Sequence, residues 1–374
     1  MSTAYRFVQA VDTLSIRGNK LFGDAGSHGD CHFPPRPSVL SGAFRSVLWA
    51  NNGHDVDAIL NSAFSIASVF PARGNSQGKL EIYLPLPADV VVTDEGKILR
   101  QLEPQAIDKR IFHSQISQLP MLPVLRQGKP SKAESGWLLN QTGINTYLQG
   151  HSLTTAHVIR QSELWANESR IGIGLNRSSR TADEGKLFTV EHTAMMQKEH
   201  WQHCENKTPA NNTVGLLVGI DGCNELPDEG FIRLGGDGRA AQYSSIAAPD
   251  IQQPSVKDKF KLVLLTPGLF NDGWLPDGVI EASGELWLKG DGFRAHLCCA
   301  AISRAEVVSG WDLVQWQPKT AERVAPAGSV YWFDQFEGNA NKLAGWVAAG
   351  IWFDNNKSQR RAEGFNRAWL ALWT

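Results

Sequence analysis

The chain has 374 residues, an apolar fraction of 42%, a charged fraction of 20% and a formal net charge of −2. This length supplies enough core for two or three domains, and the composition is that of an ordinary globular protein. The small net charge excludes a surface coated in basic residues, although it permits a local arginine groove balanced by acids elsewhere.

Cysteine usage and hydropathy exclude further classes of protein. The five cysteines are odd in number and form no C-x-x-C pair, which argues against a disulfide framework or a zinc ribbon. His200, His203 and Cys204, with His192 upstream, come nearest to a metal cluster, but their spacing fits no standard site. The chain has no run of eighteen apolar residues and no signal-like N-terminus. We therefore expect a cytoplasmic protein without membrane contact, metal or other cofactor.

The first ninety residues predict a strand, a loop, a helix and a second strand. Residues 5–14 have the pattern of a buried opening strand, and Arg17 and Lys20 accompany the glycine-rich loop at 18–29. A helix begins at about Ser38, because one apolar face recurs at helical spacing. The residues of that face are Leu40, Phe44, Val47 and Leu48. The alternating segment 80–87 predicts a strand, and its prolines, which cannot donate to a ladder, confine it to a sheet edge or a strand end.

Arg36 and Arg45 flank the first turns of this helix, with Arg45 well off the apolar face. The small Gly42 leaves room for a ligand near the helix start, where free backbone N–H groups favour anions. The alternative is a core helix with a solvated arginine. Further on, residues 96–134 are too long for a simple connection and predict an inserted subdomain, lid or arm. A short helix within 137–150 then closes at Gly150.

The stretch from 163 to 192 concentrates apolar residues, glycine and arginine. Ile171, Ile173 and Leu175 predict a buried strand, and a second strand follows at 187–190. The two glycines within the first strand indicate close approach by another backbone or a ligand. Arginines surround them with forked donors suited to phosphate. The candidate residues are Arg170, Gly172, Gly174, Arg177 and Arg180. A surface turn between strands is the alternative. The glycines are not a nucleotide-binding loop, because the dinucleotide fingerprint would need a third glycine where Arg177 stands and no G-x-x-x-x-G-K-[ST] motif occurs.

The strand pattern restarts after His192 and indicates a second α+β unit, with strands at 213–220, 259–265, 294–302 and 329–334. Between the first two lies a turn in which Gly235, Gly236 and Gly238 permit a nest of backbone N–H groups for phosphate. Arg233 and Arg239 bracket this turn. A plain hairpin turn with flanking charges is the alternative. At the C-terminus, Gly364 and Phe365 suit either a stacked base or a helix packed on the core.

Four segments carry a resemblance to a known family. They are F-P-P-R-P-S-V-L-S-G-A-F-R-S at 33–46, R-I-G-I-G-L-N-R with T-A-D-E-G-K-L-F-T-V-E-H from 170 to 192, R-L-G-G-D-G-R-A-A at 233–241 and P-A-G-S-V-Y-W-F at 326–333. In this order they resemble the third subunit of the Cmr complex, the type III-B CRISPR effector. That subunit belongs to the RAMP superfamily of RNA-binding proteins. The final G-F-G of many RAMP proteins is Gly364-Phe365-Asn366 here, which departs from the pattern.

The resemblance implies an α+β fold of two ferredoxin-like (RRM-like) units with antiparallel sheets and an insertion in the first. We place the first unit at 1–185, with the insertion at about 96–134, and the second at 186–374. The resemblance also implies a non-catalytic subunit in antiviral defence, which caps the effector filament and holds the 5′ tag of the CRISPR RNA. Its implied partners are that RNA, the large cyclase/nuclease subunit and a backbone RAMP subunit.

The sequence leaves one enzymatic alternative open. Other RAMP proteins cleave CRISPR repeat RNA without metal, using a histidine near the first helix. His28 and His32 lie in the corresponding part of this chain, and an imidazole suits activation of a 2′-hydroxyl. Neither histidine belongs to the four matching segments. We therefore expect no catalytic residue and no enzymatic activity.

Overall fold

The computed structural model divides the chain into two compact units. Unit 1 comprises Met1–Glu81, Gln161–Ala248 and Ser309–Lys319, and unit 2 comprises Ile82–Arg160, Pro249–Val308 and Thr320–Thr374. The structure describes residues 3–18, 28–60, 62–74, 79–106, 119–126, 131–176, 178–196, 213–312, 315–353 and 358–373, without the side chains of 184 and 185. Within these ranges, no helix is long and apolar enough to span a membrane.

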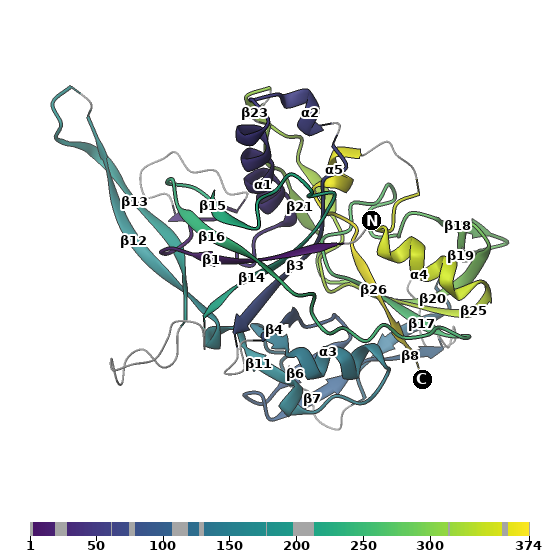
Figure 1. Ribbon diagram of the computed structural model, residues 1–374. Helices are drawn as coiled ribbons and strands as arrows, with labels where there is room; N and C mark the ends of the chain where they lie inside the picture. Colours follow the sequence, from purple (N-terminus) through teal and green to yellow (C-terminus); the bar gives the residue numbers. More distant parts are fainter. Residues whose placement is uncertain are drawn as a thin grey trace. The chain divides into compact units, whose positions relative to one another are not determined.

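A six-stranded sheet with the order β15-β16-β1-β14-β3-β4 forms the centre of unit 1 (Figure 1). The pairs that involve β1, β14 and β16 are all antiparallel. Short hairpin strands at 309–319 also group with this unit. The strands are β1 (Ala4–Ala10), β3 (Ser65–Gly74), β4 (Leu80–Ile82), β14 (Val214–Asp221), β15 (Glu229–Arg233), β16 (Ala240–Ile246), β22 (Trp311–Asp312) and β23 (Gln317–Pro318).

Helix α1 (Pro37–Asn51) covers one face of this sheet, and α2 (Val56–Leu60) follows it. Proline at the first helical position is pre-set for helix entry, where a backbone donor would have no partner. Leu40, Phe44 and Leu48 point into the core, as their spacing predicted, and Phe44 packs edge-on against Tyr243 of β16. Each such side chain contributes roughly 1.5–3 kcal/mol when fully buried. The predicted amphipathic helix is therefore confirmed.

A long hairpin of β12 (Trp165–Leu175) and β13 (Ala182–Met195) extends beyond the sheet of unit 1 (Figure 1). The short helix η2 (Gln161–Glu163) precedes it, and β2 (His28–Gly29) pairs with β13 in parallel. The root of the hairpin is anchored, because Leu14 and Thr193 exchange two backbone hydrogen bonds of 2.9 and 2.8 Å. The root is thus fixed to the segment that follows β1.

Unit 2 contains a second six-stranded sheet, in the order β18-β19-β20-β25-β17-β26. All its pairs are antiparallel. Helix α4 (Ala340–Ala348) buries Leu343 and Val347 against it, and Asn339 caps the helix start. The strands are β17 (Phe260–Leu264), β18 (Val279–Ala282), β19 (Glu285–Gly290), β20 (Phe293–Ala301), β25 (Val330–Gly338) and β26 (Ala368–Leu372).

The rest of unit 2 consists of short pairs and helices. The three-stranded sheet β11-β10-β5 packs with α3 (Gln141–Leu148), whose Asn140 cap accepts a hydrogen bond from Gly143. The predicted helix at 137–150 is therefore shorter than expected, because it starts after a strand. The other elements are β5 (Leu84–Pro85), β6 (Val90–Thr93), β7 (Ile98–Gln101), β8 (Glu103–Ala106), β9 (Met121–Val124), β10 (Trp137–Leu139), η1 (Thr155–His157), β11 (Val158–Arg160), β21 (Glu306–Val308), β24 (Glu322–Val324) and α5 (Ser358–Ala362).

The α+β class with antiparallel sheets is confirmed, but the units are not consecutive halves of the chain. The predicted boundary at 185/186 falls inside β13, and β14 returns to the sheet of β1 instead of starting a new unit. The predicted insertion at 96–134 contributes β7, β8 and β9, which belong to unit 2. Strand pairing over long sequence separations, which the sequence pattern does not encode, decides these memberships.

The C-terminal G-F-N segment serves the core of unit 2. Phe365 and Asn366 are fully buried, and the Asn366 side chain accepts a hydrogen bond of 2.6 Å from the Leu269 backbone N–H. Asn366 also adopts a positive φ of 58°, a conformation that asparagine tolerates better than most residues. Of the two sequence interpretations, packing on the core is therefore the one observed, since Phe365 offers no open ring face to a base.

Candidate nucleic-acid interface

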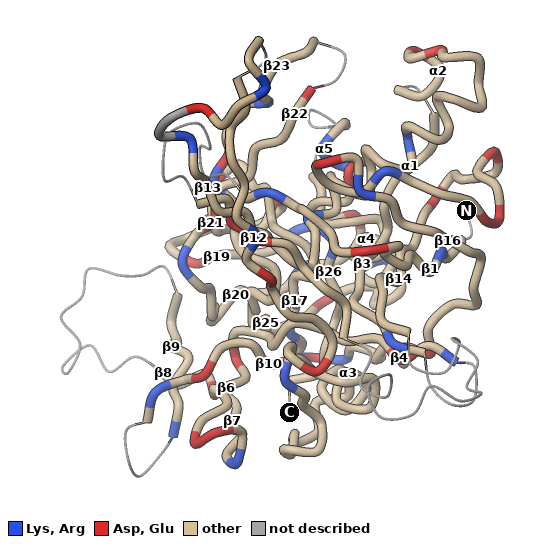
Figure 2. Tube along the Cα trace, turned by 90° about the vertical axis from the view of Figure 1, so that its left-hand side faces the viewer, with Lys and Arg blue, Asp and Glu red and all other residues tan. Residues whose placement is uncertain are grey.

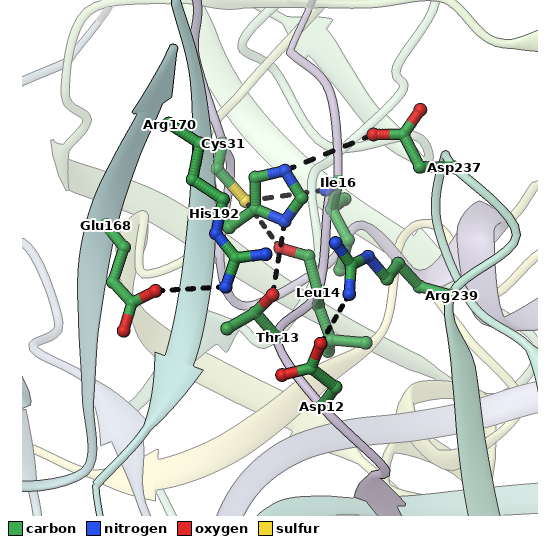
Figure 3. A network of polar contacts seen from close by, with 10 residues as sticks. All are labelled: Asp12, Thr13, Leu14, Ile16, Cys31, Glu168, Arg170, His192, Asp237 and Arg239. Atoms are coloured by element: carbon green, nitrogen blue, oxygen red, sulfur yellow. Dashed lines mark hydrogen bonds and ion pairs between the residues drawn. The ribbon is translucent and has the colours of Figure 1, made fainter. Parts of the chain in front are cut away.

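Three segments of unit 1 bring charged and polar side chains together at the root of the hairpin (Figure 3). The segment after β1 supplies Asp12 and Thr13, the hairpin supplies Arg170 and His192, and the turn between β15 and β16 supplies Asp237 and Arg239. We call these six residues the arginine cluster. Backbone hydrogen bonds hold the segments in place, since Leu14 bonds Thr193 and the Gly236 N–H donates to the Ser15 carbonyl at 2.6 Å.

The glycines of the β15–β16 turn are required by the backbone. Gly235 has a φ of 87°, and a Cβ there would lie 2.4 Å from the Ser15 carbonyl oxygen. The N–H groups of Gly236 and Arg239 already donate to Ser15 and Gly236, so they are occupied within the protein. Gly238 also has a positive φ, of 65°, but open space around it. The turn therefore serves mainly to place the side chains of Asp237 and Arg239.

Each arginine of the cluster has one carboxylate partner. Arg239 Nη1 lies 2.5 Å from Asp12 Oδ2, and Arg170 Nη2 lies 3.2 Å from Glu168 Oε2. The pKa of Asp12 is lowered, first by the hydrogen bond from the Thr13 backbone N–H and then by the positive charges of Arg239 and Arg170. The Asp12 and Glu168 side chains are 61% and 51% exposed, so water can solvate either carboxylate if its arginine binds another anion.

His192 lies buried between the two arginines. Its Nδ1 is 3.2 Å from the Thr13 hydroxyl, and its Nε2 is 4.0 Å from Asp237 Oδ2. Burial lowers the pKa of His192 below its ordinary value of 6.5, and the charges of Arg170 and Arg239 lower it further, against the opposing effect of Asp237 and Asp12. The imidazole is therefore neutral at neutral pH, and the two positive charges of Arg170 and Arg239 are balanced within the cluster by the carboxylates of Asp12 and Asp237.

The outer part of the hairpin differs from the sequence-based prediction. Ile171, Ile173 and Leu175 were expected in a buried strand, yet all three are exposed, Ile171 at 75%. They share one face with Leu187, which is opposite Ile173 and also exposed. The prediction was wrong because an apolar run of this length does not distinguish a core strand from a projecting arm. These four residues form an exposed apolar strip along the β12–β13 hairpin, which we call the hairpin arm.

Side chains of the partner strand account for the close approach at the hairpin glycines. A Cβ at Gly172 would lie 2.3 Å from the Phe188 ring, and a Cβ at Gly174 would lie 2.8 Å from the Lys186 side chain. Both glycines thus make room for the opposite strand of the hairpin. Basic and acidic residues are interspersed along the trace (Figure 2). Within β13, Lys186 pairs with Asp183.

The remaining candidates lie at separate positions. Arg180 sits in the turn of the arm with a φ of 55°, and Arg17 forms an isolated bridge with Cys31. Arg36 is the N-cap residue of α1, and the Arg45 guanidinium packs 5.6 Å from the centre of the Phe64 ring. Lys20 and Arg177 lie outside the described residues. Among the candidates that the structure describes, it joins Arg170, Arg239 and the turn glycines into one site.

Sequence reasoning missed part of the cluster. Asp12 and Thr13 drew no attention, and His192 was noted only beside the metal candidates His200, His203 and Cys204, which lie outside the described residues. The described residues contain no group of three or more metal-ligating side chains. The register that joins Leu14 to Thr193 would have revealed the cluster, but a single sequence does not encode it.

The histidines considered for catalysis make short-range contacts. His28 Nε2 lies 3.3 Å from Glu191 and 3.4 Å from Asp30, and His32 Nδ1 lies 3.1 Å from the Pro34 carbonyl oxygen. Glu191 also approaches the Cys31 backbone N–H at 3.5 Å. These contacts tie the loop before α1 to β13.

Comparison with known proteins identifies the class of this chain. The model of the CRISPR-associated protein family Cas_Cmr3 matches residues 6–373. The chain is therefore a CRISPR-associated protein. Within that class, it belongs to the Cmr3 family, as the four sequence segments indicated. A search of curated proteins found no match.

Two solved structures share the fold of this chain. One is a chain in the cryo-EM structure of the type III-B Cmr-beta complex bound to cognate target RNA and AMPPnP. It is 12% identical, with a TM-score of 0.52 over 96% of this chain and 93% of that chain. A chain in the Cmr-beta complex bound to cognate target RNA is 13% identical, with a TM-score of 0.51 over 97% and 96% of the two chains. At this identity the likeness establishes the fold.

Proposed function

We propose that the chain is a non-catalytic RNA-binding subunit of a type III-B CRISPR effector, and that the arginine cluster holds the 5′ tag of the CRISPR RNA. The observation that carries this proposal is the convergence of Arg170 and Arg239 on the Thr13 hydroxyl and the neutral His192 ring. Forked guanidinium donors match phosphate geometry and also stack on unpaired bases. The Thr13 hydroxyl and the His192 imidazole are buried and bond each other, so in this proposal the two guanidiniums make the contacts to RNA.

The ion pairs of the cluster suit ligand exchange. Pairs between exposed side chains contribute little to stability, typically about 0–1 kcal/mol. A phosphate can therefore replace Asp12 or Glu168 at small cost, and the released carboxylate returns to water. Single-stranded RNA offers no duplex groove, so side chains on loops and on a projecting arm are the expected means of contact.

The family and the similar structures suggest the assembly. Those structures are type III-B complexes bound to target RNA, and we propose that this chain also assembles with other protein subunits. The partners we propose are the large cyclase/nuclease subunit and a backbone RAMP subunit, with this chain capping the filament in antiviral defence. The apolar strip of the hairpin arm supports contact with partners, since exposed apolar patches mark interaction sites.

We further propose that both units are ferredoxin-like. A β-α-β-β-α-β unit of this kind forms one antiparallel sheet. In unit 1, β1, α1, β3, β14 and β16 follow this order without the second helix, and the fourth strand pairs with the first, the first with the third and the third with the second. In unit 2, β17, β20, β25, α4 and β26 follow the same order without the first helix. The identical order supports a duplicated origin.

The non-catalytic role is tested by incubating the purified chain with labelled CRISPR repeat RNA in the absence of metal. We expect no cleavage, because His28 and His32 are engaged in the local contacts described above. Cleavage that disappears in His28→Ala or His32→Ala would establish the endoribonuclease alternative instead.

The RNA-binding role is tested by ultraviolet crosslinking in a host that carries the complex, followed by sequencing of the RNA attached to this chain. We expect RNAs that share one 5′ end, and a several-fold smaller yield for the double variant Arg170→Ala/Arg239→Ala. Arg126→Ala is the matched control, since Arg126 is exposed and pairs with Glu103 in the insertion. Equal yields from the double variant and the wild type would contradict the proposal.

A further inference from the structure

One face of the unit 1 sheet carries an open row of side chains across its edge. Phe231 of β15 is opposite Gln242 of β16, which in turn is opposite Gln9 of β1. Directly paired residues point to the same face of a sheet. Their chain neighbours point to the other face, where Ile232 and Ala241 join the core beneath α1. Phe231 is 67% exposed on its face, so a full aromatic side chain is open to solvent there.

The neighbouring row connects this face to the arginine cluster. Arg233 is exposed and opposite Ala240, whose carbonyl oxygen accepts a hydrogen bond from the Val11 N–H. The next residue after Val11 is Asp12, and the residue before Ala240 is Arg239. Arg233 therefore supplies a guanidinium at this end of the open face, and the chain continues from here into Asp12 and Arg239 of the arginine cluster. Rows on one face are two residues apart, about 7 Å along each strand.

The opposite end of the face is acidic. Glu229 is exposed on this face and opposite Ser244. The face thus runs from the Arg233 guanidinium through an aromatic ring and two amides to the Glu229 carboxylate. RNA phosphates are attracted to the arginine end of this face and repelled from its acidic end. The middle row of Phe231, Gln242 and Gln9 therefore favours a base over a phosphate.

We propose that Phe231, Gln242 and Gln9 form a stacking subsite for one unpaired base of the RNA strand whose phosphates bind the arginine cluster. The ring of Phe231 stacks on the base, and the glutamine amides supply a donor and an acceptor each for its edge. This subsite rests on the proposed function, because it takes a base from an RNA that the arginine cluster already holds. Arg233 contacts the phosphate between the two sites.

The chemistry of the face favours RNA over a protein strand. β15 is an edge strand of the sheet, and such edges also accept an added strand through their backbone groups. A protein strand added at this edge would bond to the backbone of β15 alone. It would not need the arginine, aromatic and amide side chains that lie across the three strands. Single-stranded RNA presents the matching alternation of phosphate and base.

The subsite is tested by measuring the affinity of the full-length chain for short single-stranded RNA over a range of salt concentrations. Phe231→Ala is expected to weaken binding by about 5- to 150-fold, the range measured for loss of one stacked base. The salt dependence should stay unchanged, since no charge is removed. Phe231→Tyr should retain the affinity. Phe353→Ala is the matched control, because Phe353 is comparably exposed in unit 2.

A second measurement uses RNA in which one position at a time lacks its base. At the position whose base stacks on Phe231, removal of the base should weaken binding to the wild type. The same RNA should bind Phe231→Ala as well as the intact RNA does, because that variant has no ring on which the base can stack. Gln242→Ala, also at an exposed position, should lower affinity in a base-dependent manner. Melting temperatures of all variants close to the wild type confirm that each has folded.

The outcomes separate the two proposals. If Arg239→Ala weakens binding but Phe231→Ala behaves like Phe353→Ala, the stacking subsite is wrong and the RNA-binding function stands. If the wild type binds no RNA, or Arg239→Ala has no effect, both proposals fail. If Phe231→Ala keeps its RNA affinity but no longer assembles with the other subunits, the face is a protein interface and the subsite is overturned.

Discussion

The arginine cluster of unit 1 and a buried lysine of unit 2 both pair cations with carboxylates, but in opposite surroundings. Lys261 Nζ lies 3.0 Å from Asp89 Oδ2, and the Tyr147 hydroxyl donates to Asp89 Oδ1 at 2.8 Å. All three side chains are buried, and Lys261 also lies 3.9 Å from the centre of the Tyr147 ring. The carboxylates that pair with the arginines of the cluster, Asp12 and Glu168, by contrast face solvent.

This difference decides what each network can do. The unit 2 network joins β17 to α3 and to the chain before β6, and no external anion reaches its lysine without displacing a buried acid. Burial and the negative charge of Asp89 raise the pKa of Tyr147 well above its ordinary value, so the phenol stays protonated and donates. Exposure of the partner acid thus distinguishes a cation available for a ligand from one used for structure.

The largest expected effect concerns the buried network. Asp89→Ala leaves the Lys261 charge buried without its partner, which typically costs about 3–5 kcal/mol of unfolding free energy. Urea denaturation of Asp89→Ala, of Lys261→Met and of the double variant Asp89→Leu/Lys261→Met checks this. The double variant should recover much of the loss, because apolar replacement of a buried pair is often neutral. Single variants as stable as the wild type would show that the network is not structural.

Glycine substitutions in the β15–β16 turn come next. Gly235→Ala combines a positive φ with a Cβ pressed against the Ser15 carbonyl, whereas Gly238→Ala has the positive φ alone. We expect Gly235→Ala to cost more than the roughly 1–2 kcal/mol of the left-handed conformation, and Gly238→Ala to cost about that amount. Thermal unfolding measures both. Equal losses would mean that the contact with Ser15 does not constrain the turn.

The pH dependence of the cluster is smaller and has a defined sign. Because the folded pKa of His192 lies below 6.5, the unfolded chain binds more protons in the window between these two values. Stability therefore rises with pH through that window and falls as the solution is acidified below about pH 6.5. His192→Gln should remove this contribution. A bound phosphate should raise the pKa of His192 and make RNA binding stronger at lower pH, which titrations at pH 5.5 and 7.5 would detect.

The smallest effect on stability is expected on the hairpin arm. Ile173→Ser removes an exposed apolar side chain that packs against no core, so the unfolding free energy should change by no more than about 0.5 kcal/mol. Ile66→Ser, in the core of the same unit, is the control and should be strongly destabilising. A large loss from Ile173→Ser alone would mean that the arm folds back on the protein in solution.

The same comparison explains which features the sequence predicted. The α1 helix and the strands β14, β17, β20 and β25 followed from local periodicity and were found where expected. The arm was misjudged, because Ile171 and its neighbours carry the pattern of a core strand and only the fold reveals that nothing covers them. Arg170 and Arg239 were chosen for their chemistry. Their meeting depends on the pairing of Leu14 with Thr193, which joins positions about 180 residues apart and leaves no local signal.

The most direct test of the account is the salt dependence of single-stranded RNA binding by the wild type, Arg170→Ala, Arg239→Ala and the control Arg126→Ala. Loss of one phosphate contact reduces the steepness of log affinity against log salt by about 0.7 for single-stranded RNA. We expect this reduction for Arg170→Ala and for Arg239→Ala. Arg126→Ala should leave the slope unchanged. If the control loses as much affinity and slope as Arg170→Ala and Arg239→Ala, the cluster is not where the RNA binds.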